Sequence, residues 1–204
     1  MRRIPLSRRS HITGFQPLVT GTAEHESALE RDFVARTSLL DPAASIISQP
    51  VTLRYPDGGT MRRYTPDFLV RGGHHTARLI EVKYRADLRQ NWIRYQPAFA
   101  AARSWAREQS AVFRVVTERH IRDTVLENAK RLLPLRHAPY DTEVGSILLA
   151  TIGAQNQPTF RSVLAELPPG GRVGLSVLWR LIARGFVYVD LRAPITQETP
   201  LSLP

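Results

Sequence analysis

Hydrophobic residues recur at helical or alternating intervals along most of the chain, and they predict an ordered series of elements. Residues 24–40 place apolar side chains at helical spacing and end at Asp41-Pro42, because proline disfavours helical geometry in the residue before it. Two β-rich runs follow, over 46–55 and 61–70, with Pro56-Asp-Gly-Gly59 between them. That turn sequence is typical of a hairpin, so the two runs should pair antiparallel.

The next elements predict a mixed sheet flanked by helices. Residues 77–84 alternate apolar and polar side chains and should form a third strand. A long helix is expected over 88–108, with a kink at Pro97. Residues 111–117 are almost continuously apolar, which predicts a strand buried on both faces, and a helix should follow over 119–132. A strand, a crossover helix and a second strand imply parallel pairing, so the fold class is α/β.

The remaining third of the chain predicts a second, smaller domain. Helical patterns cover 141–154, 159–167 and 174–183, and Gly185 ends the last helix before an apolar strand at 186–191. Three short helices followed by a strand indicate a winged-helix-like α+β domain. The predicted organisation is a basic arm at 1–20, a first domain at 21–134, a linker at 135–140, the second domain at 141–192 and a loose tail at 193–204.

Charge distribution adds a prediction about the partner. The chain has 28 Lys and Arg against 18 Asp and Glu, a net charge of +10, which favours a polyanionic partner such as nucleic acid. Residues 1–138 hold 23 of the basic and 13 of the acidic residues, whereas residues 139–204 hold five of each. The absence of cysteine excludes disulfides, thiolate zinc sites and cysteine nucleophiles, and it fits a reducing cytoplasm. Apolar runs are shorter than the ~18 residues of a membrane span.

Two carboxylates and a lysine form the candidate catalytic group. Asp67 and Glu81 lie near the ends of consecutive predicted strands, and alternation places Glu81 and Lys83 on one strand face. Mg²⁺ requires such hard oxygen ligands, and Mn²⁺ accepts them too. Lys83 would orient or deprotonate the attacking water, or hold the scissile phosphate. The alternative is an ordinary turn cap at Asp67 beside an exposed ion pair, but apolar residues flank Glu81 on both sides.

A third acid precedes these strands on the first predicted helix. Glu30 lies on that helix, and Glu26 is its competitor, because it lies one turn earlier on the same face.

Five segments in order resemble a known family. Residues 25–33 read HESALERDF, residues 49–50 QP, residues 63–70 RYTPDFLV, residues 80–83 IEVK and residues 113–117 FRVVT. Their order and spacing resemble the N-terminal catalytic domain of TnsA, the PD-(D/E)xK endonuclease subunit of a heteromeric cut-and-paste transposase. The resemblance implies a restriction-endonuclease-like fold. It also implies that Glu30, Asp67 and Glu81 are the metal-binding acids and Lys83 the catalytic lysine, in preference to Glu26.

The same resemblance implies a reaction and two protein partners. The chain would cut the non-transferred strand at the 5′ side of transposon ends in double-stranded DNA, while a TnsB-like DDE transposase cuts and joins the 3′ ends. The second domain would engage a TnsC-like AAA+ regulator. Its predicted last helix contains a single internal cation, Arg180, which is too few for reading DNA, and Trp179 and Phe186 are candidate docking residues. A stand-alone restriction or repair nuclease and a non-catalytic DNA-binding scaffold are the alternatives.

Further basic residues are candidates for DNA contacts. Arg85, Arg89 and Arg94 follow the catalytic group in the sequence, the last two on the predicted long helix, and they would bind phosphates beside the active site. The alternative for each is a solvated helix face. The adjacent His74 and His75 are interpreted as a solvated turn and not as a zinc site, because the chain offers no cysteine and no spaced second histidine pair.

Overall fold

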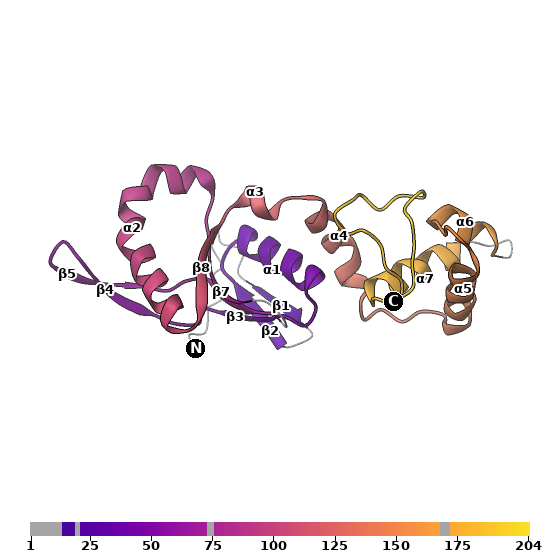
Figure 1. The fold of residues 1–204 in the computed structure, drawn as a ribbon, viewed down its shortest axis with the longest axis horizontal. Helices are drawn as coiled ribbons and strands as arrows, with labels where there is room; N and C mark the ends of the chain where they lie inside the picture. The colour runs from indigo at the N-terminus through magenta and orange to yellow at the C-terminus, as the bar shows by residue number, and fades with distance from the viewer. Residues whose placement is uncertain (1–13, 19–20, 73–75, 168–171) are drawn as a thin grey trace. The chain divides into compact units, whose positions relative to one another are not determined.

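The computed structural model describes residues 14–18, 21–72, 76–167 and 172–204 (Figure 1). The chain divides into two units, Met1–Asp123 and Thr124–Pro204. The predicted boundary at residue 134 differs from this division, because the helix expected at the end of the first domain belongs partly to the second unit. Most of the predicted arm and the His74-His75 pair lie outside the described residues, but residues 14–18 of the arm form a strand.

The first unit contains eight strands among its described residues. They are β1 (Gly14–Leu18), β2 (Gly21–His25), β3 (Ser45–Ser48), β4 (Leu53–Asp57), β5 (Thr60–Tyr64), β6 (Phe68–Arg71), β7 (Ala77–Val82) and β8 (Ala111–Val116). Strands β3, β6, β7 and β8 form one sheet in that order, while β1–β2 and β4–β5 are separate antiparallel pairs. Each of the two long runs predicted from the sequence is therefore two strands in the structure. The parts far from the turn, β3 and β6, join the sheet, and the parts next to the turn, β4 and β5, form a hairpin around Gly58 and Gly59. Both glycines have positive φ, which the tight turn requires.

Strand directions confirm the predicted mixed sheet. β6 pairs antiparallel with β3 and with β7, and β7 pairs parallel with β8. The prediction that β8 is buried on both faces is wrong. β8 is an edge strand with alternating burial, and its Val112 is 38% exposed, because among the described strands only β7 pairs with it.

Three helices flank this sheet: α1 (Ala28–Leu40), α2 (Arg85–Glu108) and α3 (Glu118–Ile121). α1 begins four residues later than predicted, because residues 21–25 form β2 and Ser27 caps the helix through Glu30 N–H. α2 is interrupted at Asn91 (φ −115°, ψ 15°) and not at Pro97, which lies within the helical part. The Asp87 carboxylate accepts hydrogen bonds from Asn91 Nδ2 at 2.7 Å and Tyr95 Oη at 2.8 Å, which hold the two parts of α2 at this bend.

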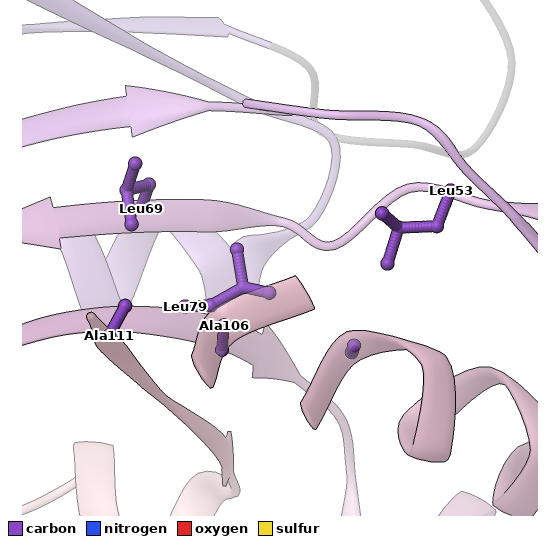
Figure 2. Close-up of a cluster of buried hydrophobic side chains, with 6 residues drawn as sticks. Leu53, Leu69, Leu79, Ala106 and Ala111 are labelled. Carbon is purple, nitrogen blue, oxygen red and sulfur yellow. The ribbon is translucent and has the colours of Figure 1, made fainter. Parts of the chain in front are cut away.

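The sheet buries apolar side chains on both faces. On one face, Leu69 and Leu79 pack with Ala102 and Ala106 of α2 and with Leu53 of the hairpin (Figure 2). On the other face, the Phe68 ring stacks on Phe33 of α1 at 5.4 Å. Since Leu79 and Glu81 are two residues apart on β7, both lie on the α2 face. The hairpin β4–β5 extends past the sheet beside α2, so hairpin and helix enclose that face (Figure 1).

The second unit contains four α-helices and a short 3₁₀ helix among its described residues. They are α4 (Thr124–Leu132), η1 (Leu133–Leu135), α5 (Thr142–Ala154), α6 (Phe160–Ala165) and α7 (Arg172–Ala183). α5, α6 and α7 match the three predicted helices within two residues at each end. The predicted helix over 119–132 is instead two helices, α3 and α4, with Arg122 and Asp123 between them.

The end of the chain differs from its prediction. Residues 186–191 form no strand; Tyr188 makes one bridge to Ser202, so a winged-helix form is not confirmed. The tail is not loose. Ile195 and Leu201 are 5% and 4% exposed, and the Asn128 amide donates to the carbonyls of Leu191 and Ala193. None of the described helices is long and apolar enough to cross a membrane.

Candidate active site

A cleft of about 1220 Å³ opens on the α2 face of the first unit. The β4–β5 hairpin supplies one wall, and the part of α2 after the bend supplies another. Its polar lining residues are Glu26, Thr52, Tyr55, Asp57, Arg62, Arg63, Tyr64, Thr65, Asp67, Glu81, Lys83, Arg94 and Tyr95. Three of the four predicted catalytic residues, Asp67, Glu81 and Lys83, are therefore in one cleft with three arginines.

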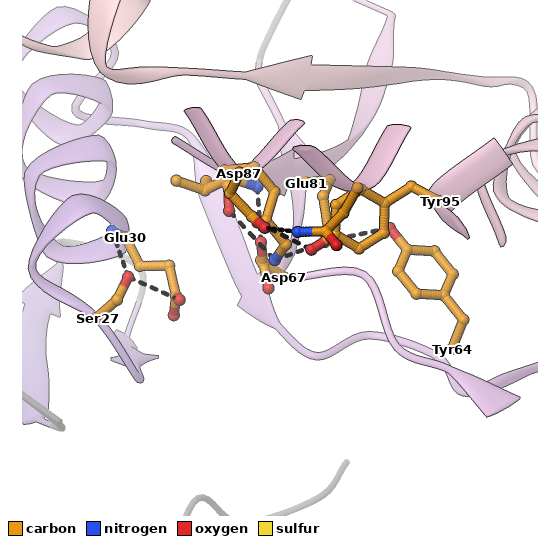
Figure 3. A network of polar contacts seen from close by, with 10 residues as sticks. Ser27, Glu30, Tyr64, Asp67, Glu81, Asp87 and Tyr95 are labelled. Atoms are coloured by element: carbon orange, nitrogen blue, oxygen red, sulfur yellow. Dashed lines mark hydrogen bonds and ion pairs between the residues drawn. The ribbon is translucent and has the colours of Figure 1, made fainter. Parts of the chain in front are cut away.

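The sheet brings the two carboxylates together. Asp67 immediately precedes β6, and Glu81 is near the end of the antiparallel neighbour β7, where Phe68 pairs with Ile80. Asp67 Oδ2 accepts the Val82 N–H at 2.6 Å, so this carboxylate caps the end of the β6–β7 ladder (Figure 3). No described residue donates a hydrogen bond to its second oxygen, Oδ1. Asp67 thus combines a fixed orientation with one oxygen open to the cleft.

Glu81 is 3% exposed, and both of its carboxylate oxygens have partners. Lys83 Nζ lies 2.8 Å from Oε1, and Tyr64 Oη donates to Oε2 at 2.6 Å. The backbone N–H of Lys83 donates to the Val116 carbonyl at 3.0 Å and extends the β7–β8 pairing. Glu81 is therefore not the exposed member of an ordinary surface ion pair, which was the alternative interpretation of this motif.

Burial and mutual charge shift the pKa values of this group. Burial raises the pKa of Asp67 well above its usual range, the Glu81 charge adds to this, and Lys83 opposes it. Burial also raises the pKa of Glu81, against the effects of Lys83 and the Tyr64 hydroxyl. Burial lowers the pKa of Lys83, but the two carboxylates outweigh it and leave that pKa above its usual value. Such mutual perturbation in a cleft is typical of functional sites.

Glu30 is not brought into this group. Its Oε1 accepts from Ser27 Oγ at 2.8 Å and its Oε2 from the Glu26 N–H at 2.7 Å, so the carboxylate caps α1 (Figure 3). It is still near enough for its charge to raise the pKa values of Asp67 and Glu81. Among the described residues, no three acidic or histidine side chains converge closely enough to hold a metal ion. The assignment of Glu30 as a metal ligand stays a prediction.

Glu26, the competitor, lines the cleft. Its Oε1 accepts from Gln49 Nε2 at 2.9 Å. Gln49 has a positive φ of 46°, and its N–H donates to the Asp67 carbonyl at 2.8 Å. Gln49 therefore links Glu26 to the backbone of a predicted catalytic residue, and the choice between Glu26 and Glu30 stays open.

The predicted DNA contacts separate into two places. Arg94 lines the cleft, whereas Arg85 and Arg89 line another hollow near the start of α2. Sequence reasoning missed the cleft residues Arg62, Arg63 and Tyr64. A signal was available for two of them, since Arg63 and Tyr64 belong to the segment 63–70 that resembles the family.

One family of known proteins matches part of the first unit. Residues 42–118 match the family described as TnsA-like endonuclease N terminal. The matched segment contains Asp67, Glu81 and Lys83 but neither Glu26 nor Glu30. No curated protein matches the chain. The segment 42–118, which contains the mixed sheet and helix α2, is therefore similar to the N-terminal domain of TnsA-like endonucleases.

Proposed function

We propose that this chain is the metal-dependent DNA endonuclease subunit of a heteromeric cut-and-paste transposase, and that it hydrolyses the non-transferred strand at the 5′ side of transposon ends. The proposal rests on the observation that Asp67, Glu81 and Lys83 line one cleft together with three arginines, in a TnsA-like domain. If the Asp67 and Glu81 carboxylates were far apart, a non-catalytic scaffold would be the better interpretation. Here Glu81 is close enough to Asp67 for its charge to add to the effect of burial and raise the Asp67 pKa.

The donor set of the cleft fits a hard divalent cation. Asp67 Oδ1 and the Glu81 carboxylate are oxygen ligands, and the chain contains no thiol that would favour a softer metal. Asp67 and Glu81 would hold Mg²⁺, with Glu30 or Glu26 as a further acid. A bound Mg²⁺ would supply a nucleophilic water at neutral pH and stabilise charge on the phosphate.

The chain's own side chains prepare the reaction in two ways. Lys83 and Tyr64 hold the two Glu81 oxygens, which fixes the direction of that carboxylate. Arg63 and Arg94 offer guanidinium groups to the phosphates of a strand in the cleft, since five fixed N–H donors suit phosphate oxygens. Water attacks phosphorus, the bond from phosphorus to O3′ breaks, and the leaving oxygen takes a proton. The products are a 5′-phosphate and a 3′-hydroxyl.

The two units would have different partners. Residues 1–123 contain 20 basic and 12 acidic residues, a net charge of +8, while residues 124–204 contain eight and six, a net charge of +2. The first unit would bind DNA and a TnsB-like transposase, and the second a TnsC-like regulator. Phe186 and Tyr188 are 46% and 53% exposed and are the candidate docking side chains. Trp179 is less suited than its sequence suggests, because its ring packs on Phe160 at 5.3 Å.

Cleavage of a transposon-end duplex tests the proposal. With the cognate transposase present, we expect cuts on the 5′ side of the non-transferred strand, and with the chain alone we expect little or no cutting. The strands are labelled separately and resolved on denaturing gels. Efficient cutting of plain duplex DNA by the chain alone would instead identify a restriction or repair nuclease with the same acids.

The metal requirement is a separate expectation. Mg²⁺ and Mn²⁺ should support cleavage, whereas Ca²⁺ should bind without supporting it, because all the candidate ligands are carboxylate oxygens. The measurement is the cleavage rate after chelation and re-addition of each cation. Full activity in excess chelator would contradict a metal-dependent mechanism.

A further inference from the structure

A second basic hollow lies outside the catalytic cleft. It has a volume of about 430 Å³ and is lined by Arg85, Leu88, Arg89, Thr117, Arg119 and His120. It shares no lining residue with the cleft, and its residues come from the first turns of α2, from Thr117, which follows β8 and caps α3, and from α3 itself. The function proposed above uses none of these side chains.

The three guanidinium groups of this hollow have no carboxylate partner in a salt bridge among the described residues. Other arginines of the first unit do: Arg36 pairs with Asp123 at 2.8 Å, and Arg62 pairs with Asp57 at 2.6 Å. Glu118 accepts the backbone N–H of Arg85 at 2.9 Å and so links the start of α2 to α3. This hydrogen bond, together with the charges of Arg85 and Arg119, holds the pKa of Glu118 below its usual value. Three like charges held around one hollow favour an anion within it.

His120 adds a further donor. The Thr117 N–H donates to His120 Nδ1 at 3.1 Å, which leaves the ring proton on Nε2. The Thr117 Oγ1 atom also lies 3.1 Å from Nδ1, and both contacts orient the ring. The lining therefore combines fixed and charged donors with no acidic side chain.

The hollow lies at the same end of the sheet as the catalytic carboxylates. β7 and β8 are parallel neighbours, so Lys83 and Thr117 directly follow the same end of these two strands. Arg85 is two residues beyond Lys83, so their Cα atoms are at most about 7 Å apart. A DNA strand bound in the cleft would bring further phosphates to this end of the sheet, because duplex DNA carries one charge per about 1.7 Å of its axis.

We infer that this hollow, formed by Arg85, Arg89, Arg119 and His120, binds a backbone phosphate of the DNA next to the cut site. The inference rests on the proposed function and deepens it. DNA is favoured over an acidic protein segment because the hollow lies at the same end of β7 and β8 as Lys83 of the cleft. These arginines hold the duplex and take no part in the reaction.

The test measures duplex binding by the full chain in the absence of divalent cations, over a series of salt concentrations. The triple variant R85Q, R89Q and R119Q is compared with the triple variant R103Q, R107Q and R114Q, which removes the same charge at exposed positions away from both hollows. Each neutralised phosphate contributes about 0.9 to the salt slope, so the first variant, which loses the one phosphate held in the hollow, should lose about 0.9 from it. Between about 50 and 200 mM salt, wild type should then lose roughly 3.5-fold more affinity than this variant. The control variant should keep nearly the wild-type slope.

The charge reversal R89E at a single exposed position provides a second variant, and thermal melts verify that each variant is folded. Equal slopes for the two triple variants, with normal DNA binding by wild type, would overturn this inference alone. Failure of wild type to bind any duplex would overturn the proposed function as well. Unchanged DNA binding of the first variant with lost capture of the transposase partner would assign the hollow to an acidic protein segment, and it would overturn the DNA assignment.

Discussion

The substitution Asp67→Asn should lower the rate of DNA cleavage at least a hundredfold, and it should raise the stability of the first unit at neutral pH without divalent cations. The rate falls because an amide replaces a charged oxygen ligand at the open Oδ1 position, and losing such a group costs at least a hundredfold. The amide oxygen can still accept the Val82 N–H, so the cap on the β6–β7 ladder is kept.

The rise in stability follows from the direction of the Asp67 pKa. Burial and the Glu81 charge raise this pKa in the folded protein, so the folded state binds the proton more tightly than the unfolded chain does. The stabilising contribution of Asp67 is full below its unfolded pKa of about 3.9 and is lost as pH rises through the folded value. Asparagine does not ionise, so the variant avoids the cost that wild type bears at neutral pH.

The substitution Lys83→Ala provides the matched comparison. It should also lower cleavage at least a hundredfold, but it should reduce stability, because it leaves the buried Glu81 carboxylate without its ion pair. The chain's other lysine, Lys130, is exposed and pairs with Glu127 among the described residues, so Lys130→Ala is the control. Cleavage rates and chemical denaturation are measured for all variants. If Asp67→Asn and Lys83→Ala both retain more than about a tenth of wild-type cleavage, the site is assigned wrongly.

The substitution Phe99→Ala should destabilise the first unit by about 3 to 5 kcal/mol, the usual cost of removing a buried aromatic ring. Phe99 is fully buried. Its ring lies 5.5 Å from Tyr95, 5.4 Å from Phe113 and 6.2 Å from Tyr64. The loss should weaken the site too, because Tyr64 and Tyr95 line the cleft and would lose the ring against which they pack.

Chemical denaturation can isolate this effect on the first unit. In a Trp179→Phe background, the two remaining tryptophans, Trp92 and Trp105, report on the unit that contains Phe99. The control is Ile93→Ala on the same helix, where an 84% exposed side chain should contribute less than about 0.5 kcal/mol. A loss below about 1 kcal/mol for Phe99→Ala would mean that this aromatic cluster does not stabilise the unit.

The sequence predicted the parts of the fold that depend on local chemistry. Pro56-Asp-Gly-Gly59 identified the hairpin, and alternation along residues 77–84 placed Glu81 and Lys83 on one face, where they are found. The strand that follows α2 was placed correctly as parallel to β7. Its burial was predicted wrongly, because apolar composition does not reveal that a strand lies at the edge of a sheet.

The remaining differences depend on contacts distant in sequence. The break between α3 and α4 has no proline or glycine to signal it, and Arg36 of α1 holds Asp123 there from 87 residues away. Tyr64 and Arg62 could not be placed in the site from local patterns, since their role depends on how the hairpin lies against α2. Glu30 was predicted as a ligand by resemblance, whereas in this structure its local capping hydrogen bonds orient the carboxylate.

The buried positions of Ile195 and Leu201 have a consequence for the order of events during synthesis on the ribosome. The first unit ends at Asp123, so all of its core residues are made before most of the second unit exists. The second unit lacks part of its core until Leu201 has been added, 78 residues later. At about 5 to 20 residues per second, that interval lasts roughly 4 to 16 s. The first unit can therefore fold co-translationally before the core of the second unit is complete.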